Sequence, residues 1–98
     1  MKKITKLTEL VNGINIIKFS AKWCGPCKKI TPIIDKLEEE LPKANFYNVD
    51  IGTSNDITTA FNISSIPSIL ILNGNKPLDM IVGTMDKITI KNRINKHL

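Results

Sequence analysis

The stretch INIIKFSAKWCGPCKKITPIIDKLEEEL, residues 14–41, decides the fold. Its first six residues are mostly apolar and β-branched, which predicts a strand in the middle of a sheet. From Cys24 to Leu41 apolar residues recur at helical spacing, with charged residues on the other face, so we expect a helix there. Pro32 lies inside this pattern and predicts a kink. Cys24 and Cys27 therefore stand where a strand gives way to a helix.

Residues 42–72 continue the alternation of strand and helix. We expect a second strand at residues 45–49, and a short helix that starts around residues 52–54 and includes Ile57. A third strand, residues 68–72, is almost entirely apolar and is predicted to be buried. In the front half of the chain, the strand from residue 14, the helix from Cys24 to Leu41 and the strand at residues 45–49 form a strand–helix–strand unit, which implies parallel pairing with a right-handed crossover.

The two ends of the chain complete the predicted fold. Asn73-Gly74 is a strong turn signal that predicts a hairpin, with residues 78–82 as the returning strand. Asp86 can cap a last helix. The expected apolar stripe of that helix is Ile90, Ile94 and Leu98. Residues 1–13 suggest only a short edge strand near Ile4 and one helical turn at residues 7–11. The order predicts an α/β sandwich, a mixed sheet with helices on its faces, in a single domain over residues 1–98.

Composition excludes several classes of protein. No apolar segment after Met1 resembles a signal peptide, and no apolar run could span a membrane, so we expect a cytoplasmic protein with no membrane partner. The net charge is +5, but the basic residues lack interleaved aromatics, which favours a solvated basic surface over nucleic-acid binding. A bond between two cysteines three residues apart would constrain the unfolded chain very little, so this pair is poorly placed as a structural disulfide.

The Cys-x-x-Cys spacing is compatible with half of a zinc site, a redox dithiol or an accidental pair. Zinc needs about four ligands, and His97 is the only other soft ligand, far away at the C-terminus. Haem attachment requires His after the second cysteine, where Lys28 stands. We therefore expect neither metal nor cofactor, and the redox interpretation is favoured.

A dithiol at the start of a helix has a physical basis for redox chemistry. The positive end of the helix dipole and its unpaired N–H groups favour a thiolate. Cys24, nearer the helix start, is therefore predicted to attack, and Cys27, one turn inward, to resolve the mixed disulfide. Gly25 allows close approach of the backbone, and Pro26 suits the first turn, where its missing N–H costs nothing.

The segment WCGPCK, residues 23–28, resembles the active-site signature of the thioredoxin family. The resemblance covers nearly the whole chain, with Ile66-Pro67 at the family's cis-proline segment, Gly83 at its glycine near the active site, and an N-terminus several residues shorter than usual. It implies a thioredoxin-like three-layer sandwich. It also implies that Pro67 is cis and faces the cysteines, which leaves the Ile66 backbone free to pair with an extended substrate. Trp23 is expected to shape the same substrate surface.

The resemblance also implies an activity. Reduced Cys24 would attack a disulfide in a substrate protein, Cys27 would release the product, and a thioredoxin reductase-like electron donor would recharge the pair without a bound cofactor. We expect a monomer that acts in electron transport and cell redox homeostasis. The Gly-Pro pair between the cysteines is typical of reducing members. Two alternatives stay open, namely a more oxidising oxidase or isomerase type and a thioredoxin-like binding or assembly module.

Lys18 departs from the family pattern. It stands six residues before Cys24, where thioredoxins carry a buried aspartate, and Phe46 stands where they often have a lysine beside that aspartate. Strand alternation puts Lys18 on one face with Ile16, so we expect it to be at least partly buried. In one interpretation, burial lowers the pKa of Lys18, and its amine accepts the Cys27 proton or its charge favours the thiolate. In the other, Lys18 reaches the surface or pairs with an acid, and Cys27 uses water.

Overall fold

The computed structural model describes residues 1–53 and 55–98, and its centre is a mixed five-stranded sheet in the order β1-β3-β2-β4-β5. Its strands are β1 (Lys2–Lys3), β2 (Ile14–Ser20), β3 (Asn45–Asp50), β4 (Ser68–Asn73) and β5 (Lys76–Val82). The other elements are the 3-10 helix η1 (Leu7–Glu9) and the helices α1 (Gly25–Glu40), α2 (Asn55–Ala60) and α3 (Lys87–Asn95). β3 runs parallel to β1 and β2, whereas β4 is antiparallel to both β2 and β5. The predicted α/β fold with a mixed sheet is confirmed.

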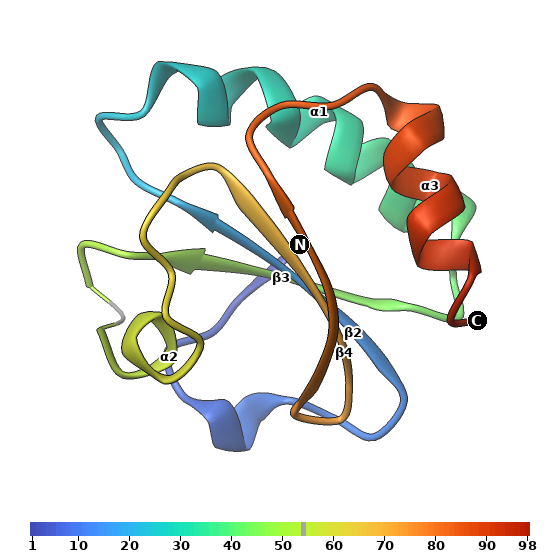
Figure 1. Ribbon diagram of the computed structural model, residues 1–98, viewed down its shortest axis with the longest axis horizontal. Coiled ribbons are helices and arrows are strands. Elements are labelled where there is room, and N and C mark those ends of the chain that lie inside the picture. Colours follow the sequence, from blue (N-terminus) through green and yellow to red (C-terminus); the bar gives the residue numbers. More distant parts are fainter. Residues whose placement is uncertain (54) are drawn as a thin grey trace.

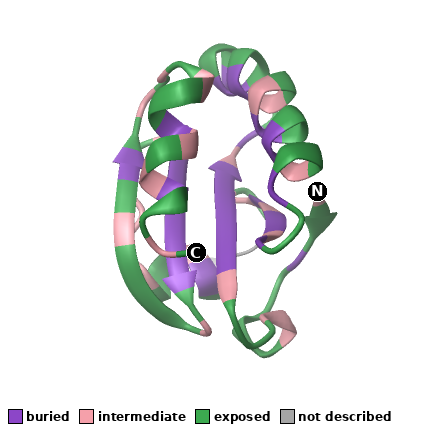
Figure 2. Cartoon of the chain, turned by 90° about the vertical axis from the view of Figure 1, so that its right-hand side faces the viewer, coloured by how far each residue is buried: buried purple, intermediate pink, exposed green. Residues whose placement is uncertain are grey.

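Three layers result from how the strands distribute their apolar side chains. α1 and α3 cover one face of the sheet and α2 covers the other (Figure 1). Along β2, Ile16 joins the core beneath α1 and α3, whereas Ile17 and Phe19 join the core that contains Ile57 of α2. The buried residues are concentrated on the inner strands, and the edge strand β5 is largely exposed (Figure 2). The central strand is therefore buried on both faces, as its nearly continuous apolar sequence predicted.

Helix α1 carries the cysteine pair at its first turn. Its apolar face buries Ile30, Ile34 and Leu37 completely against the sheet. Pro32 lies within the helix, on the exposed side, and the helical assignment continues through it. The kink expected there stays a prediction. This packing fixes the start of α1 against the carboxyl end of β2.

The N-terminal end of the chain agrees with the sequence-based expectation, because β1 is a short edge strand and η1 is a single helical turn, whereas the C-terminal end differs from it. β1 occupies Lys2–Lys3, and Ile4 follows it as a buried residue whose N–H donates to the Asn48 carbonyl. The predicted apolar stripe was wrong at Leu98, which is exposed because α3 ends at Asn95. Asp86 occupies the cap position of α3, but its side chain makes no capping hydrogen bond. The expected start of the short helix includes Ser54, which lies outside the described residues.

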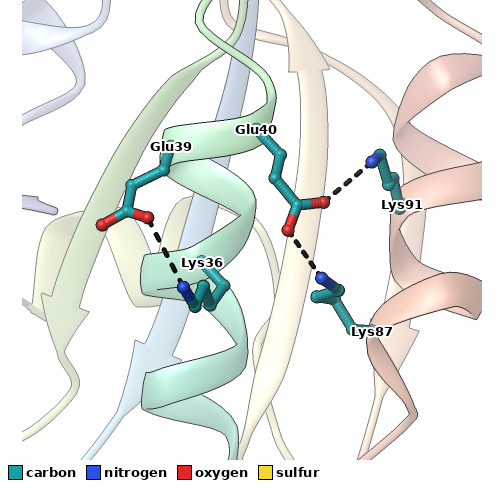
Figure 3. A network of polar contacts seen from close by, with 5 residues as sticks. All are labelled: Lys36, Glu39, Glu40, Lys87 and Lys91. Atoms are coloured by element: carbon teal, nitrogen blue, oxygen red, sulfur yellow. Dashed lines mark hydrogen bonds and ion pairs between the residues drawn. The ribbon is translucent and has the colours of Figure 1, made fainter.

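Ion pairs join α3 to the rest of the fold. Glu40, at the end of α1, accepts hydrogen bonds from Lys87 at 2.6 Å and Lys91 at 2.8 Å (Figure 3). Arg93 binds Asp79 of β5 through two hydrogen bonds of 2.6 and 2.8 Å. Part of the basic charge near the C-terminus is thus used within the fold. Among the described residues, none of the helices is long and apolar enough to cross a membrane.

Candidate active site

The two cysteines lie at the junction of the central strand and the first helix. β2 ends at Ser20 and α1 begins at Gly25, with Cys24 as its N-cap in extended conformation. The Cys24 N–H donates to the Ala21 carbonyl at 3.2 Å, which closes the connecting loop. The Cys27 N–H donates to Cys24 Sγ, also at 3.2 Å. The sulfur of Cys24 therefore occupies the place of a capping acceptor at the positive end of the helix dipole.

Cys24 and Cys27 form a disulfide, with their Cα atoms 5.3 Å apart. Cys24 is 7% exposed and Cys27 is 3% exposed, so the first cysteine is slightly closer to solvent. Ala21, Ile51 and Ile66 pack around the pair and form a small apolar cluster with it. A thiolate formed at either cysteine would lie at the start of a helix and would otherwise be surrounded mainly by buried protein atoms. The neighbouring protein groups therefore determine how readily the thiol loses its proton.

Trp23 presents a large apolar surface beside the disulfide. Its side chain is 72% exposed, the most exposed of the large hydrophobic side chains in the described part of the chain. A Cβ added to Gly52 would lie 3.4 Å from the indole Cζ3 and 3.2 Å from Asp50 Oδ1. The Asp50 carboxylate itself accepts the Gly52 N–H at 2.8 Å. Glycine at this position therefore lets the indole rest against the turn after β3, a support that the sequence pattern did not reveal.

The residues between the cysteines are exposed. Pro26 lies in the first turn of α1, as predicted, where no intrahelical N–H is required. A Cβ on Gly25 would meet no atom within 4 Å. The described residues outside its own helical turn therefore make no close approach to Gly25, and the space beside it is open.

The Ile66–Pro67 peptide bond is cis, as the resemblance implied. Ile66 packs against the cysteine cluster, so this segment lies beside the disulfide. Gly83, at φ +87°, donates its N–H to the Pro67 carbonyl at 2.8 Å and ties the end of β5 to the same segment. Within residues 1–53 and 55–98, no hydrogen bond involves the Ile66 backbone. Its N–H and C=O are therefore available to an extended peptide.

Lys18 lies behind the disulfide, on the side of the sheet that α1 covers. It is 5% exposed, and its Nζ donates a 2.6 Å hydrogen bond to Thr31 Oγ1. The Thr31 hydroxyl in turn donates to the Cys27 carbonyl at 3.0 Å. Burial lowers the pKa of Lys18, and the negative charge of Asp35 acts in the opposite direction. A chain of two hydrogen bonds thus connects a buried cation to the backbone of the second cysteine.

These contacts decide part of the prediction for Lys18. The expected burial beside Ile16 is confirmed, and Phe46 is buried on the same face. Lys18 neither reaches the surface nor forms an ion pair within 4 Å in the part of the chain described. Thr31 was not among the predicted site residues. Its position four residues after Cys27, one turn along the helix, is the signal that would have identified it.

Comparison with known proteins identifies the class to which this fold and site belong. The sequence profile of the thioredoxin family matches residues 3–96. The thioredoxin of Chlamydia trachomatis is 36% identical over 88 residues, which cover 90% of this chain and 86% of that protein. The thioredoxin of Staphylococcus saprophyticus is 34% identical and aligns with 89% of this chain and 85% of its own length.

Solved structures give the same result. The thioredoxin of Plasmodium falciparum superimposes with a TM-score of 0.89 at 28% identity and covers all of both chains. Mitochondrial thioredoxin 3 of Saccharomyces cerevisiae has a TM-score of 0.88 at 28% identity, covering 98% of this chain and 94% of that one. The fold and the paired cysteines define a protein thiol–disulfide oxidoreductase. The chain belongs to the thioredoxin family.

Proposed function

We propose that this protein reduces disulfides in other proteins, with Cys24 as the attacking thiolate and Cys27 as the resolving thiol. The observation that carries the proposal is the position of Cys24 Sγ at the start of α1, where it accepts the Cys27 N–H. A helix terminus favours the thiolate, which is the reactive form. Cys27 is the more buried of the two, which suits a group that attacks a mixed disulfide within the same protein.

The reaction consists of two exchanges between thiolate and disulfide. Cys24 attacks one sulfur of the substrate disulfide, a mixed disulfide forms, and the other substrate sulfur leaves as a thiolate that takes a proton from water. Cys27 then loses its proton and attacks Cys24 Sγ, which releases the second substrate sulfur. The substrate gains two electrons, and this protein ends as the Cys24–Cys27 disulfide. A thioredoxin reductase-like donor would return two electrons to it.

The substrate surface in this proposal surrounds the disulfide. The unpaired Ile66 backbone would bind an extended substrate segment by strand addition. Trp23 would cover the substrate from the side of the connecting loop, and Gly83 would hold Pro67 in place. Gly25 and Pro26 would leave the approach to Cys24 open. The support for each of these roles is that the residue lies near the two cysteines.

The setting of the reaction is also a proposal. We place the protein in the cytoplasm as a monomer with a single domain over residues 1–98, where it would contribute to electron transport and redox homeostasis. The small number of cysteines supports a reducing compartment. Ion pairs formed by Lys87, Lys91 and Arg93 leave less basic surface for nucleic acid, which argues against that partner.

A reduction assay tests the proposed function. The protein is added to a disulfide-bonded substrate protein with dithiothreitol as electron donor, and the release of substrate thiols is followed over time. We expect the wild-type protein to accelerate release, and a Cys24→Ser/Cys27→Ser double variant to leave the dithiothreitol rate unchanged. Equal rates for the two proteins would contradict the proposal and would favour a binding or assembly role.

A further inference from the structure

A buried cation, Lys18, lies behind the active-site disulfide and takes no part in the two exchange steps of the proposed reaction. Lys18 projects from β2 toward α1, and its ammonium group is held by the Thr31 hydroxyl. Because that hydroxyl uses its own proton on the Cys27 carbonyl, it accepts from Lys18. The two hydrogen bonds hold the positive charge against Thr31 in the second turn of α1, two hydrogen bonds away from the backbone carbonyl of Cys27.

Among the residues that the structure describes, Lys18 has no close counterion. Its neighbours in the sheet register are Asn48 on β3 and Ile69 on β4, and neither carries a charge. From α1, Asp35 is the charged residue whose field acts on Lys18, and it forms no ion pair with Lys18 within 4 Å in the described residues. A buried cation with no adjacent carboxylate is screened less than a surface cation and acts over a longer distance.

The other charges near the disulfide differ in kind from Lys18. Lys22, Lys28 and Lys29 flank the cysteines in sequence, but all three are exposed, so solvent and salt screen them. Asp50 is the acidic residue near Trp23, and its Oδ1 accepts the Gly52 N–H in an exposed hydrogen bond, so solvent screens its charge as well. Lys18 is the buried charge among these residues, so it should have the largest effect on the stability of a thiolate in the reduced site.

We propose that Lys18, positioned by Thr31, sets the reduction potential of the Cys24–Cys27 pair by stabilising negative charge on the reduced dithiol. The inference deepens the proposed function, on which it rests. When two electrons enter, the bond between the sulfurs breaks, one sulfur takes a proton and the other remains a thiolate. The disulfide form carries no charge at this place. The ammonium therefore stabilises the reduced form selectively and makes the disulfide easier to reduce.

The size of the effect follows from Coulomb's law. A unit charge about 10 Å from a thiolate, at an effective dielectric constant of about 20, changes the ionisation equilibrium by roughly 10- to 20-fold. The effect on the redox equilibrium appears only at a pH where the reduced pair carries a thiolate. It should therefore be large at a pH where a thiolate has formed and Lys18 still holds its proton, and absent where both sulfurs are thiols.

Equilibration with glutathione tests the proposal. Lys18→Met removes the charge and keeps an unbranched side chain that suits a buried site, and Lys29→Met makes the same charge change on the exposed surface two residues after Cys27. We expect Lys18→Met to shift the equilibrium toward the protein disulfide by about fivefold or more at about pH 8.5. The shift should disappear near pH 5, and Lys29→Met should change the equilibrium by less than about twofold at either pH.

A second variant separates the charge from the packing. Thr31→Val keeps the shape of the side chain but removes the hydroxyl that holds the ammonium, and it should move the equilibrium in the same direction by a smaller factor. The thiolate absorbance of reduced Lys18→Met should titrate at higher pH than that of the wild type. Both variants are first checked for cooperative unfolding, and Lys18→Gln replaces Lys18→Met if the latter fails to fold.

The outcomes distinguish this inference from the function on which it rests. If wild-type protein reduces a substrate disulfide but folded Lys18→Met has an unchanged glutathione equilibrium at about pH 8.5, Lys18 does not set the potential and the inference is wrong. A shift of equal size at both pH values also overturns it, because the thiolate would not be involved. Failure of the proposed function would instead appear as a wild-type protein that reduces no substrate.

Discussion

Replacement of Trp23 by alanine should impair the reduction of protein substrates and leave the fold intact. The indole is 72% exposed, so little of it is buried within the protein. An aromatic side chain of this type offers roughly 200 Å² for burial, which leaves about 150 Å² free at Trp23. A substrate protein that covered half of that area would gain about 2 kcal/mol, at ~25 cal/mol per Å². We therefore expect kcat/KM for a protein disulfide to fall by about 20- to 30-fold.

The assay compares a protein disulfide with a small one. Oxidised glutathione cannot cover the indole to the same extent, so Trp23→Ala should reduce kcat/KM for glutathione disulfide by less than about threefold. The free energy of unfolding should change by less than about 1 kcal/mol, as measured by denaturant titration. This combination separates a role in substrate binding from a role in the chemistry of the cysteines.

A matched control is available on α3. Ile88 is also a large, exposed apolar residue, at 65%, but the adjacent Lys87 is paired with Glu40 at the opposite end of α1 from Cys24. Ile88→Ala should leave both substrates unaffected. Equal losses of kcat/KM for the protein and the small disulfide in Trp23→Ala, or no loss for either, would refute the reasoning about the substrate surface.

Two further predictions concern stability. The hydrogen bonds from Lys87 and Lys91 lower the pKa of Glu40 to about 2, below the ordinary value of 4.5, so the stabilisation they provide is present above pH 4.5 and is lost as the pH falls toward 2 (Figure 3). Glu40→Gln should therefore lower the midpoint of thermal unfolding at pH 7 by more than Glu39→Gln does, since Glu39 faces Lys36 at 3.9 Å with both side chains exposed. The loss of thermal stability in Glu40→Gln should become smaller at acidic pH. A loss that stays the same at low pH would contradict this assignment. Leu37 is completely buried, so Leu37→Ala should lower the free energy of unfolding, measured by denaturant titration, by about 2–5 kcal/mol. Lys36→Ala, at an exposed position, should change it by less than about 0.5 kcal/mol. Similar losses for the two variants would show that α1 does not pack against the sheet as described.

The central part of the fold could be predicted because the sequence signals there agree with one another. β2 has a run of apolar side chains that must be buried, and α1 has an apolar face formed by Ile30, Ile34 and Leu37. Packing α1 against the sheet beside β2 buries both sets. Alternation along β2 also predicted that Lys18 would share a face with Ile16 and be at least partly buried. These features depend on residues near one another in sequence, and the structure confirms them.

Features that depend on distant segments were less accessible. The cis bond before Pro67 followed only from the resemblance to a family, since few bonds of this kind are cis. Thr31 carries a local signal in its spacing of four residues from Cys27, but its contact with Lys18 on another element does not follow from that spacing. Gly52 gains its importance from Trp23 on another segment, and no local pattern identifies it. The assignment of Leu98 to the buried stripe of α3 was wrong because helical spacing does not specify where a short helix ends.

The central claim is that Cys24 attacks the substrate disulfide and Cys27 resolves the intermediate. Trapping the mixed disulfide tests it most directly. Reduced Cys27→Ser and Cys24→Ser variants are each incubated with a disulfide-bonded protein, and the adducts are quantified by mass spectrometry under non-reducing conditions. The account predicts a stable adduct through Cys24 in Cys27→Ser and little or none in Cys24→Ser. An adduct through Cys27 that forms as fast as the one through Cys24 would contradict it.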